Sequence, residues 1–297
     1  MPRIKRIHDK PIITKEMDPD NLDNINGPSV IKVPDWIENP LGKYYMYFAH
    51  HQGKFIRLAY TDNIEGEWKL YKPGTLQLEQ SHYVNHIASP DILIDDEKQE
   101  IIMYYHGVLD KNTTNFKGQR SSVATSKDGI TFNADNNTIL GPFYFRVFKH
   151  EGYTYSIAKT IKGSSGGVLS RSADGISEFE EGPAILEGQR HVAIDKKDNT
   201  LHVYYTRIGD NPEAILYTQI NLEGDWRNWK ADEPQLILKP ETEYEGGHLP
   251  LEPSREGSVH KPVNQLRDPG YFEENGKKYL FYSCAGESSM GLVELCD

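Results

Sequence analysis

Five residues of this sequence have side chains that can exchange protons, and they occupy similar positions relative to short apolar segments. Carboxylates and imidazoles serve most often as general acids and bases, because they change protonation state near or below neutral pH. Each of the five lies within three residues of a short apolar or aromatic run, which is typical of a strand end. The candidate proton-transfer residues are Asp91, His106, His191, Asp268 and Glu287.

Positive charge gathers at the same strand ends, although the chain as a whole is acidic. Its 44 Asp and Glu against 33 Lys and Arg give a formal net charge of −11. The strand ends carry only the three carboxylates already named, but five basic side chains, which are Arg146, Lys159, Arg190, Arg207 and Arg267. Because the guanidinium group binds a carboxylate or sulfate with two hydrogen bonds, this local excess favours an anionic ligand. The alternative is that these charges pair among themselves, Arg267 with Asp91 or Asp268, and fill the centre of the fold.

Three further polar residues extend the expected binding site: Asn26, His51 and His86. Strand alternation directs only one of His50 and His51 inward, and His51 is preferred. Imidazoles also bind metals, so a central metal ion held by some of His51, His86, His106, His191 and His260 is an alternative, although these residues lack a tight ligand spacing. The expected chemistry requires no cofactor. The remaining histidines are expected on the surface or in outer strands, namely His8, His82, His150 and His202.

These positions recur because the chain repeats a strand pattern five times. The second strand of each repeat is rich in aromatic and β-branched residues, in the segments 44–51, 101–106, 153–159, 201–207 and 279–284. A first strand and a polar turn precede each of these segments, and a third strand follows most of them. Two turn motifs also recur, in the pairs 125–132 with 171–179 and 64–68 with 222–226. They predict a fourth, outer strand, and units of about 59 residues are typical of propeller blades.

We therefore predict an all-β fold, a five-bladed β-propeller with four-stranded antiparallel blades, in one domain spanning residues 1–297. The segment Arg3–Thr14 is expected to supply the strand that the last repeat lacks and so to close the ring. An insertion within Leu236–Val263 is expected to form a loop at the rim. The innermost strands of a propeller surround its centre, so the start of strand one and the end of strand two share the face that carries the candidate residues.

Composition excludes several other classes of protein. The acidic balance argues against binding to nucleic acid. No apolar run approaches the roughly 20 residues of a membrane-spanning helix. Cys284 and Cys296 cannot form a disulfide framework, which favours a reducing compartment. The basic stretch Met1–His8 lacks the apolar core of a secretory signal, so a cytoplasmic location is expected. The sequence does not fix the oligomeric state.

Three segments, in this order along the chain, resemble one superfamily of enzymes. They are Ile25–Val30, Ala88–Leu93, and Arg267–Glu273 followed by Lys278–Ser283. Over nearly the whole length the chain resembles the five-bladed β-propeller glycoside hydrolases, which include families 43, 32, 62, 68 and 117. That resemblance implies a carboxylate base on blade one, an orienting Asp on blade two and a Glu acid on blade three. Asp91 matches the second position, but Asn26 occupies the first and the segment 141–146 contains no Glu.

Because an amide cannot act as a general base, a replacement set is required if the chain is a hydrolase. We expect Asp91, ionised beside the basic cluster, and Asp268 as base or orienting carboxylates, with Glu287 as a further carboxylate. The resemblance to family 117 implies a His acid, for which His106 or His191 is preferred and His86 is the third option. Arg190, Arg207 and Arg267 are then expected to clamp the substrate.

The predicted function is hydrolysis of a glycosidic bond in an anionic or unusual saccharide, bound in a central pocket. One alternative is a propeller that binds carbohydrate without catalysis, because two of the three carboxylates implied by the resemblance are absent. Another is an interaction scaffold with a protein partner, which would present an apolar patch instead of charged residues.

Overall fold

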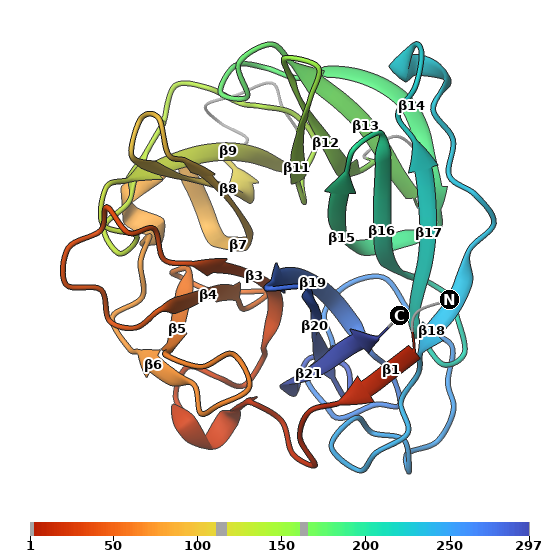
Figure 1. The fold of residues 1–297 in the computed structure, drawn as a ribbon. Helices are drawn as coiled ribbons and strands as arrows, with labels where there is room; N and C mark the ends of the chain where they lie inside the picture. The colour runs from red at the N-terminus through yellow and green to blue at the C-terminus, as the bar shows by residue number, and fades with distance from the viewer. Residues whose placement is uncertain (1–2, 111–117, 161–165, 297) are drawn as a thin grey trace. The chain divides into compact units, whose positions relative to one another are not determined.

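The computed structural model describes residues 3–110, 118–160 and 166–296. The chain is an all-β, five-bladed β-propeller of antiparallel sheets, as predicted (Figure 1). The contacts within the chain define two compact units, one formed by residues 1–27, 159–169 and 182–297 and the other by residues 28–158 and 170–181. No helix in the described part of the chain is long and apolar enough to cross a membrane.

The first three sheets each contain four strands. The first sheet has the order β3 (Asn26–Lys32), β4 (Tyr44–Ala49), β5 (Arg57–Thr61) and β6 (Lys69–Tyr71). The second has the order β7 (Tyr83–Asp95), β8 (Glu100–Leu109), β9 (Gln119–Ser126) and β10 (Asn133–Ala134). The third has the order β11 (Arg146–His150), β12 (Tyr153–Lys159), β13 (Gly166–Ser172) and β14 (Glu180–Glu187).

The last two sheets contain the C-terminal half of the chain. The fourth has the order β15 (Gln189–Lys197), β16 (Thr200–Arg207), β17 (Ile215–Asn221) and β18 (Gln235–Leu238). The fifth has the order β19 (Arg267–Glu274), β20 (Lys277–Cys284), β21 (Ser289–Cys296) and β1 (Arg3–Arg6), and the short β2 (Ile13–Thr14) also pairs with β21. Three 3₁₀ turns complete the described elements: η1 (Lys15–Met17), η2 (Leu78–Gln80) and η3 (Trp226–Asn228).

The repeated turn motifs lead to outer strands for a physical reason that both copies share. Asp128 accepts hydrogen bonds from the backbone N–H groups of Ile130 and Thr131, at 2.8 and 2.7 Å. Asp174 accepts the equivalent bonds from Ile176 and Ser177, at 3.0 and 2.9 Å. These Asp-capped turns reverse the chain after the third strand, and β10 and β14 follow them as predicted.

The rim insertion occupies only part of the Leu236–Val263 segment, because the first residues of that segment form a strand. Leu236 and Leu238 belong to β18 and pair with β17, Leu236 opposite Leu216 and Leu238 opposite Ile215. The Gln235–Leu238 segment is therefore the outer strand of the fourth blade, and the insertion begins after Leu238. The prolines that follow this strand masked its short apolar pattern in the sequence.

Two of the histidines expected on the surface or in outer strands also lie elsewhere. His150 is 6% exposed at the end of β11, where its ring lies 6.3 Å from that of Tyr155. His202 lies in the second strand of its blade, β16, with its Nδ1 atom 2.7 Å from the hydroxyl of Tyr217. Aromatic neighbours on the adjacent strands cover both imidazoles.

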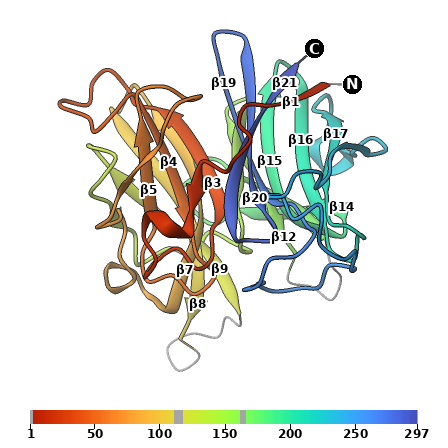
Figure 2. The same ribbon diagram turned by 90° about the horizontal axis from the view of Figure 1, so that it is seen from below.

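The N-terminal strand completes the fifth blade, as predicted. Arg3 to Arg6 pair in register with Cys296 to Val293, and Figures 1 and 2 both place β1 alongside β21. Arg6 also binds the fully buried Glu245 through two hydrogen bonds of 2.9 Å. Burial alone would raise the pKa of Glu245, but the bonds from Arg6, the backbone and Tyr282 hold that pKa below its usual value. Glu245 thus binds the N-terminal strand as a carboxylate.

We predict that Arg6→Ala lowers the free energy of unfolding by about 2–3 kcal/mol, because it leaves the buried Glu245 carboxylate without its charged partner. Lys5→Ala, on the same strand, is the matched control. Lys5 is 62% exposed and forms an ion pair with Glu294 at 3.1 Å, so we expect a loss below about 1 kcal/mol. Urea denaturation of both variants measures the difference, and equal losses would show that the Glu245 contact does not anchor β1.

Candidate active site

The predicted site residues divide between the two units. Five lie in the unit that begins at Pro28: His51, His86, Asp91, His106 and Arg146. The other unit contains the remaining eight: Asn26, Lys159, Arg190, His191, Arg207, Arg267, Asp268 and Glu287. In the second set, most members are connected by hydrogen bonds or ion pairs, as described below.

Bulges at the start of three innermost strands explain how consecutive residues enter one polar network. The strand register shifts between Ala88 and Asp91 in β7, between Gln189 and Val192 in β15, and between Arg267 and Gly270 in β19. A regular strand sends consecutive side chains to opposite faces, whereas a bulge adds a residue and redirects them. As a result, both members of the pairs Arg190–His191 and Arg267–Asp268 are at least 95% buried.

The backbone of Asp268 is held in a sparsely populated conformation. Its φ angle is +47°, and the equivalent residues before proline on the other innermost strands, Ser89 and Gly27, have φ angles of +49° and +63°. For a residue other than glycine this conformation costs of order 1–3 kcal/mol, so the surrounding structure must impose it. The Asp268 carboxylate is therefore fixed in direction by the bulge.

Asp268 and His191 form the closest acid–imidazole contact among the predicted residues. The Oδ1 atom of Asp268 lies 2.7 Å from Nδ1 of His191, and the side chains are only 1% and 7% exposed. A carboxylate that accepts the Nδ1 proton orients the imidazole and stabilises its protonated form. The Nε2 atom is then the position at which His191 can give or take a proton. This pair can therefore act in general acid–base chemistry.

Two arginines beside this pair share one buried carboxylate that the sequence prediction missed. Arg190 donates from Nε to both oxygens of Glu213, at 2.8 and 3.1 Å. The Nε atom of Arg267 lies 3.6 Å from Oε2 of Glu213, and Nη1 of Arg267 donates to Oε1 of Glu287 at 2.8 Å. Glu213 and Glu287 are almost completely buried. The network thus contains two guanidinium groups and two carboxylates in close contact.

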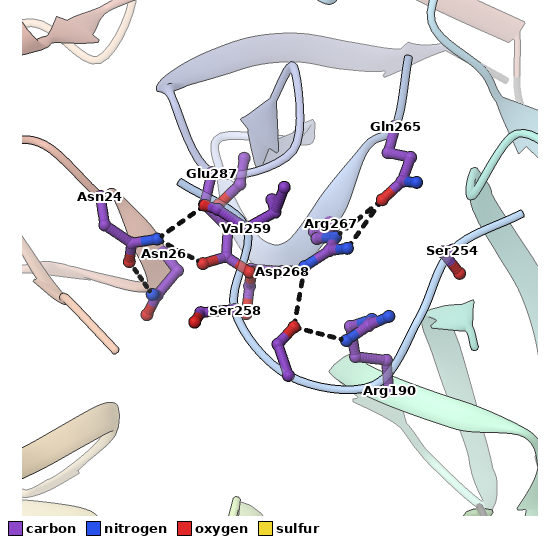
Figure 3. A network of polar contacts seen from close by, with 12 residues as sticks. Asn24, Asn26, Arg190, Ser254, Ser258, Val259, Gln265, Arg267, Asp268 and Glu287 are labelled. Atoms are coloured by element: carbon purple, nitrogen blue, oxygen red, sulfur yellow. Dashed lines mark hydrogen bonds and ion pairs between the residues drawn. The ribbon is translucent and has the colours of Figure 1, made fainter. Parts of the chain in front are cut away.

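Amide side chains extend the network from Glu287. Asn26 donates from Nδ2 to the Oδ1 atom of Asn24 at 2.7 Å, and Asn24 donates to Oε2 of Glu287 (Figure 3). Gln265 accepts from Nε and Nη2 of Arg267, at 3.2 and 2.7 Å. Asn26, which stands where the resemblance implies a carboxylate, therefore donates to another amide, which in turn donates to Glu287.

Each of the five basic residues has a carboxylate partner, so the inferred excess of positive charge was wrong. Arg207 pairs with Asp210 at 3.2 Å, Lys159 with Glu256 at 3.1 Å, and Arg146 with Asp91 at 3.8 Å. The sequence count omitted Asp210, Glu213 and Glu256. Arg267 pairs with Glu287 and Glu213, whereas the sequence alternative gave Asp91 or Asp268 as its partner. The charges thus pair among themselves, although with different partners.

Glu213 carried a signal that the sequence interpretation did not use. It directly precedes the apolar segment Ala214–Ile220, which is the third strand of its blade. The third strand runs parallel to the first, so its start lies at the same end of the sheet as the start of β15 and the end of β16. The sequence interpretation placed candidate residues only at the start of the first strand and the end of the second strand of each blade. Glu256 and Gln265, in contrast, lie in the irregular insertion or just after it, where no strand pattern locates a side chain.

Asp91 lies in the other unit, close to Arg146. Its Oδ2 atom accepts a hydrogen bond from the backbone N–H of Val147 at 2.7 Å. Burial raises the pKa of Asp91 to about 6, and Arg146 and the backbone bonds offset only part of that effect. Burial therefore outweighs the basic neighbour in setting the pKa of this carboxyl group. The carboxylate remains mostly ionised at pH 7 but takes up a proton in mild acid.

This raised pKa predicts a particular dependence of stability on pH. Because native Asp91 binds its proton more tightly than the unfolded chain does, its contribution is fully present below about pH 4 and is lost as the pH rises through about 6. Relative to Asp91→Asn, we expect the wild type to lose about 2–3 kcal/mol of unfolding free energy over that window. Urea denaturation at pH 4, 5, 6 and 7 measures this difference.

Asp95→Asn is the matched control for this measurement. Asp95 ends the same strand, and the hydrogen bond from the backbone N–H of Lys98 lowers its pKa. Its contribution to stability therefore grows as the pH rises, opposite in sign to that of Asp91. A wild-type curve that runs parallel to that of Asp91→Asn would contradict the assignment.

Two histidines of the same unit lie near one another with aromatic neighbours. The rings of His86 and His106 are 6.4 Å apart, and His106 lies 5.5 Å from the ring of Phe143 and 5.7 Å from that of Tyr144. Burial lowers the pKa of His86, whose Nε2 atom lies 2.9 Å from Oε1 of Gln119. His51 is half-buried after β4 and close enough to His86 to lower that pKa further.

The alternative of a central metal ion held by histidines receives no support from the arrangement of the described side chains. Within residues 3–110, 118–160 and 166–296, no group of three or more His, Cys, Asp or Glu side chains is placed to hold a metal ion. A metal ion therefore stays a prediction from residue type alone.

A cavity borders the arginine network. Its volume is about 340 Å³, near the lower end of the range for small-molecule sites. It is lined by Glu252, Pro253, Arg255, Glu256, Ser258, Val259, Lys261, Val263, Gln265 and Arg267. Polar and charged side chains predominate in this lining, as a ligand rich in hydroxyl groups would require.

The five-bladed β-propeller fold of this chain is shared with solved structures of carbohydrate-active enzymes. A family 43 β-xylosidase/α-arabinofuranosidase from a compost microbial metagenome, solved with xylotriose, has a TM-score of 0.63 and 14% identity, over 99% of this chain and 95% of that one. A family 43 enzyme from Xanthomonas citri, solved with xylose, has a TM-score of 0.62 and 9% identity, over 98% and 89%. An N-acetylgalactosamine deacetylase from F. plautii, in complex with blood group B trisaccharide, has a TM-score of 0.62 and 11% identity, over 91% and 89%.

At these identities the comparison establishes the fold and leaves the reaction open. A closer relative is the "Uncharacterized protein R118" of Acanthamoeba polyphaga mimivirus, which is 39% identical over 93% of this chain and 85% of its own length. The chain belongs to the same family as that viral protein. No family model matches the sequence.

Proposed function

We propose that this protein hydrolyses a glycosidic bond of a saccharide and that His191, oriented by Asp268, supplies the proton to the leaving oxygen. The observation that carries the proposal is the buried contact of 2.7 Å between the two side chains. Glycoside hydrolysis requires an acid for the leaving group and a second group to activate water or attack the sugar. An imidazole held by a carboxylate is suited to the first task near neutral pH.

The group that activates water stays a prediction from the sequence, where Asp91 is expected as a base or orienting carboxylate. With a pKa of about 6, Asp91 is mostly ionised at pH 7 and retains enough basicity to accept a proton from water. Glu287 is held by Arg267 and Asn24, so it is better suited to orient groups or stabilise charge than to transfer protons. Direct inversion would require the acid and the base to stand roughly 6.5–9.5 Å apart across the bound sugar.

The proposed substrate is an oligosaccharide bound mainly through its hydroxyl groups. The similar structures support a saccharide ligand, since they were solved with xylotriose, xylose and blood group B trisaccharide. The anionic character expected from the sequence has less support, because carboxylates already pair with all five basic residues. A uronic or sulfated sugar would have to displace those partners, whereas neutral hydroxyls can bind alongside them.

A turnover screen tests this proposal. Purified protein is incubated with neutral, uronic and sulfated oligosaccharides, and new reducing ends are quantified alongside the His191→Gln variant. Release by the wild type that the variant lacks supports the proposal. Equal release by both proteins would show that His191 is not the acid, and a preference for uronic or sulfated sugars would restore the anionic substrate.

A second candidate function, carbohydrate binding without catalysis, is favoured by the amides at the start of the first blade. Asn24 and Asn26 bind one another and Glu287, and an amide does not supply the base of the related enzymes. This candidate predicts saccharide binding in calorimetry, no release of reducing ends, and the same affinity in His191→Gln. The absence of a cofactor requirement and the cytoplasmic location remain predictions.

A further inference from the structure

The rim segment Ser254–Val259 lies against the arginine network and is bound to it through backbone oxygens. Arg190 donates from Nη2 to the carbonyl of Arg255 and from Nη1 to that of Gly257 at 3.2 Å. Arg267 donates from Nη1 to the same Gly257 carbonyl at 3.2 Å, as Figure 3 shows. Asn24 donates to the carbonyl of Val259 at 3.2 Å. Three buried donor side chains of the network thus end on three carbonyls of one segment.

Two side chains of the segment itself also bind residues outside it. Glu256, 75% exposed, accepts from Nζ of Lys159 at 3.1 Å. Ser254 accepts from the backbone N–H of Gly209 at 3.0 Å, donates from its hydroxyl to the carbonyl of Arg207 at 3.3 Å, and donates from its backbone to that of Asp210 at 3.1 Å. Arg190, Arg207, Arg267 and Lys159, all expected from the sequence to bind substrate, therefore contact this segment.

Little apolar burial secures the segment. Residues 255–258 are exposed, and Val259, half-buried, is its apolar side chain in contact with the fold. Polar contacts exchange readily with water or a ligand, whereas buried apolar area would oppose opening. Segments of this kind open locally at a small fraction of the free energy of global unfolding.

We propose that Arg190, Arg267 and Asn24 form a subsite for saccharide hydroxyl groups, which the rim segment occupies as an internal substitute and leaves when saccharide binds. Hydroxyl oxygens accept hydrogen bonds as carbonyl oxygens do. When a saccharide replaces the segment, each buried donor therefore keeps an acceptor, whereas departure of the segment without a ligand would remove these acceptors. The adjoining cavity of about 340 Å³ supplies space for sugar rings. This inference rests on the proposed saccharide substrate and adds where the sugar binds and what it displaces.

The proposal has a quantitative consequence. If only the open form binds, the apparent affinity is the intrinsic affinity multiplied by the fraction of molecules that are open. A substitution that loosens the segment without touching the subsite therefore tightens binding by the factor by which it raises that fraction. Ser254 is a suitable position, because it holds the segment and is neither a subsite residue nor part of the cavity lining.

The test compares wild type with Ser254→Ala and with Glu243→Gln. Glu243 is exposed on the same insertion, and no described residue forms an ion pair with it, so it is the matched control. Amide hydrogen exchange across residues 254–260 measures opening. Calorimetry with neutral di- and trisaccharides, including xylotriose, measures binding. Near-ultraviolet circular dichroism confirms that all three proteins are folded.

We expect about tenfold faster exchange in Ser254→Ala, since it loses two side-chain hydrogen bonds, and about tenfold tighter saccharide binding. Glu243→Gln should match the wild type in both measurements. Unchanged exchange, or faster exchange with unchanged or weaker affinity, would overturn this inference and leave the proposed function intact. Failure of all three proteins to bind any saccharide would overturn the proposed function, and the inference with it.

Discussion

Asp268→Asn is expected to lower kcat for glycosidic cleavage by about 10³- to 10⁴-fold, with little change in KM. The asparagine fits the same space but can present an N–H to Nδ1 of His191, where a carboxylate oxygen now lies 2.7 Å away. The imidazole then loses both its fixed tautomer and the charge that stabilises its protonated form. Initial rates on the oligosaccharide that the wild type cleaves measure the loss.

The pH–rate profile separates this role from a structural one. Because the asparagine no longer stabilises the imidazolium, the alkaline limb of the kcat profile should move to lower pH in Asp268→Asn. A defect confined to packing would lower the rate at every pH and leave the limb in place.

The double variant Asp268→Asn/His191→Gln provides the control. Residues that act as a unit are strongly non-additive, so the double variant should be about as slow as the slower single variant. Multiplication of the two single effects would show that Asp268 and His191 act independently and would contradict their assignment as a pair.

Glu213→Gln is expected to lower the free energy of unfolding by about 3–5 kcal/mol. Both Arg190 and Arg267 are 2% exposed, and Glu213 is the carboxylate that they share. The substitution retains the size of the side chain but leaves Arg190 without its carboxylate partner and removes one of the two from Arg267. Buried cations that lose a partner in this way account for some of the largest effects of single substitutions.

Urea denaturation of Glu213→Gln and Glu294→Gln measures this effect against a matched control. Glu294 also forms an ion pair, with Lys5 at 3.1 Å, but Lys5 is 62% exposed and can be solvated by water when the pair is lost. We expect a loss below about 1 kcal/mol for the control. Similar losses in the two variants would mean that the arginines tolerate the change through their remaining partners.

The blades could be predicted from sequence because the forces that define them are local. Turn residues such as Asp128 and Asp174 bind backbone groups two and three positions further along the chain. Aromatic strands such as Tyr44–Ala49 are recognisable by composition alone. Strand β18 shows the limit of this approach, since the 222–226 turn motif predicted an outer strand but four residues before a proline-rich insertion carry too little pattern to give its bounds.

The partners of the charged side chains could not be predicted, because they lie far apart in sequence. Glu213 is 23 residues from Arg190, and Glu256 is 97 residues from Lys159. The basic residues Lys159, Arg190 and Arg267 do lie at strand ends. The local excess of positive charge disappears once the carboxylates of Asp210, Glu213 and Glu256 are included. Bulges add a second difficulty, since they bury the consecutive pair Arg267 and Asp268 where regular alternation would bury one of them.

The pairing of β1 with β21 has a consequence for how the chain reaches its folded state during translation. Arg3 is synthesised 293 residues before its strand partner, Cys296. Local hairpins such as β19 and β20 can form as soon as they are synthesised, whereas a contact of this sequence separation forms later and carries a large loop-closure entropy. Strand β1 is therefore exposed until β21 has been synthesised, and it carries the cationic side chains Arg3, Lys5 and Arg6. Positive charge of this kind discourages pairing with another nascent chain during that interval.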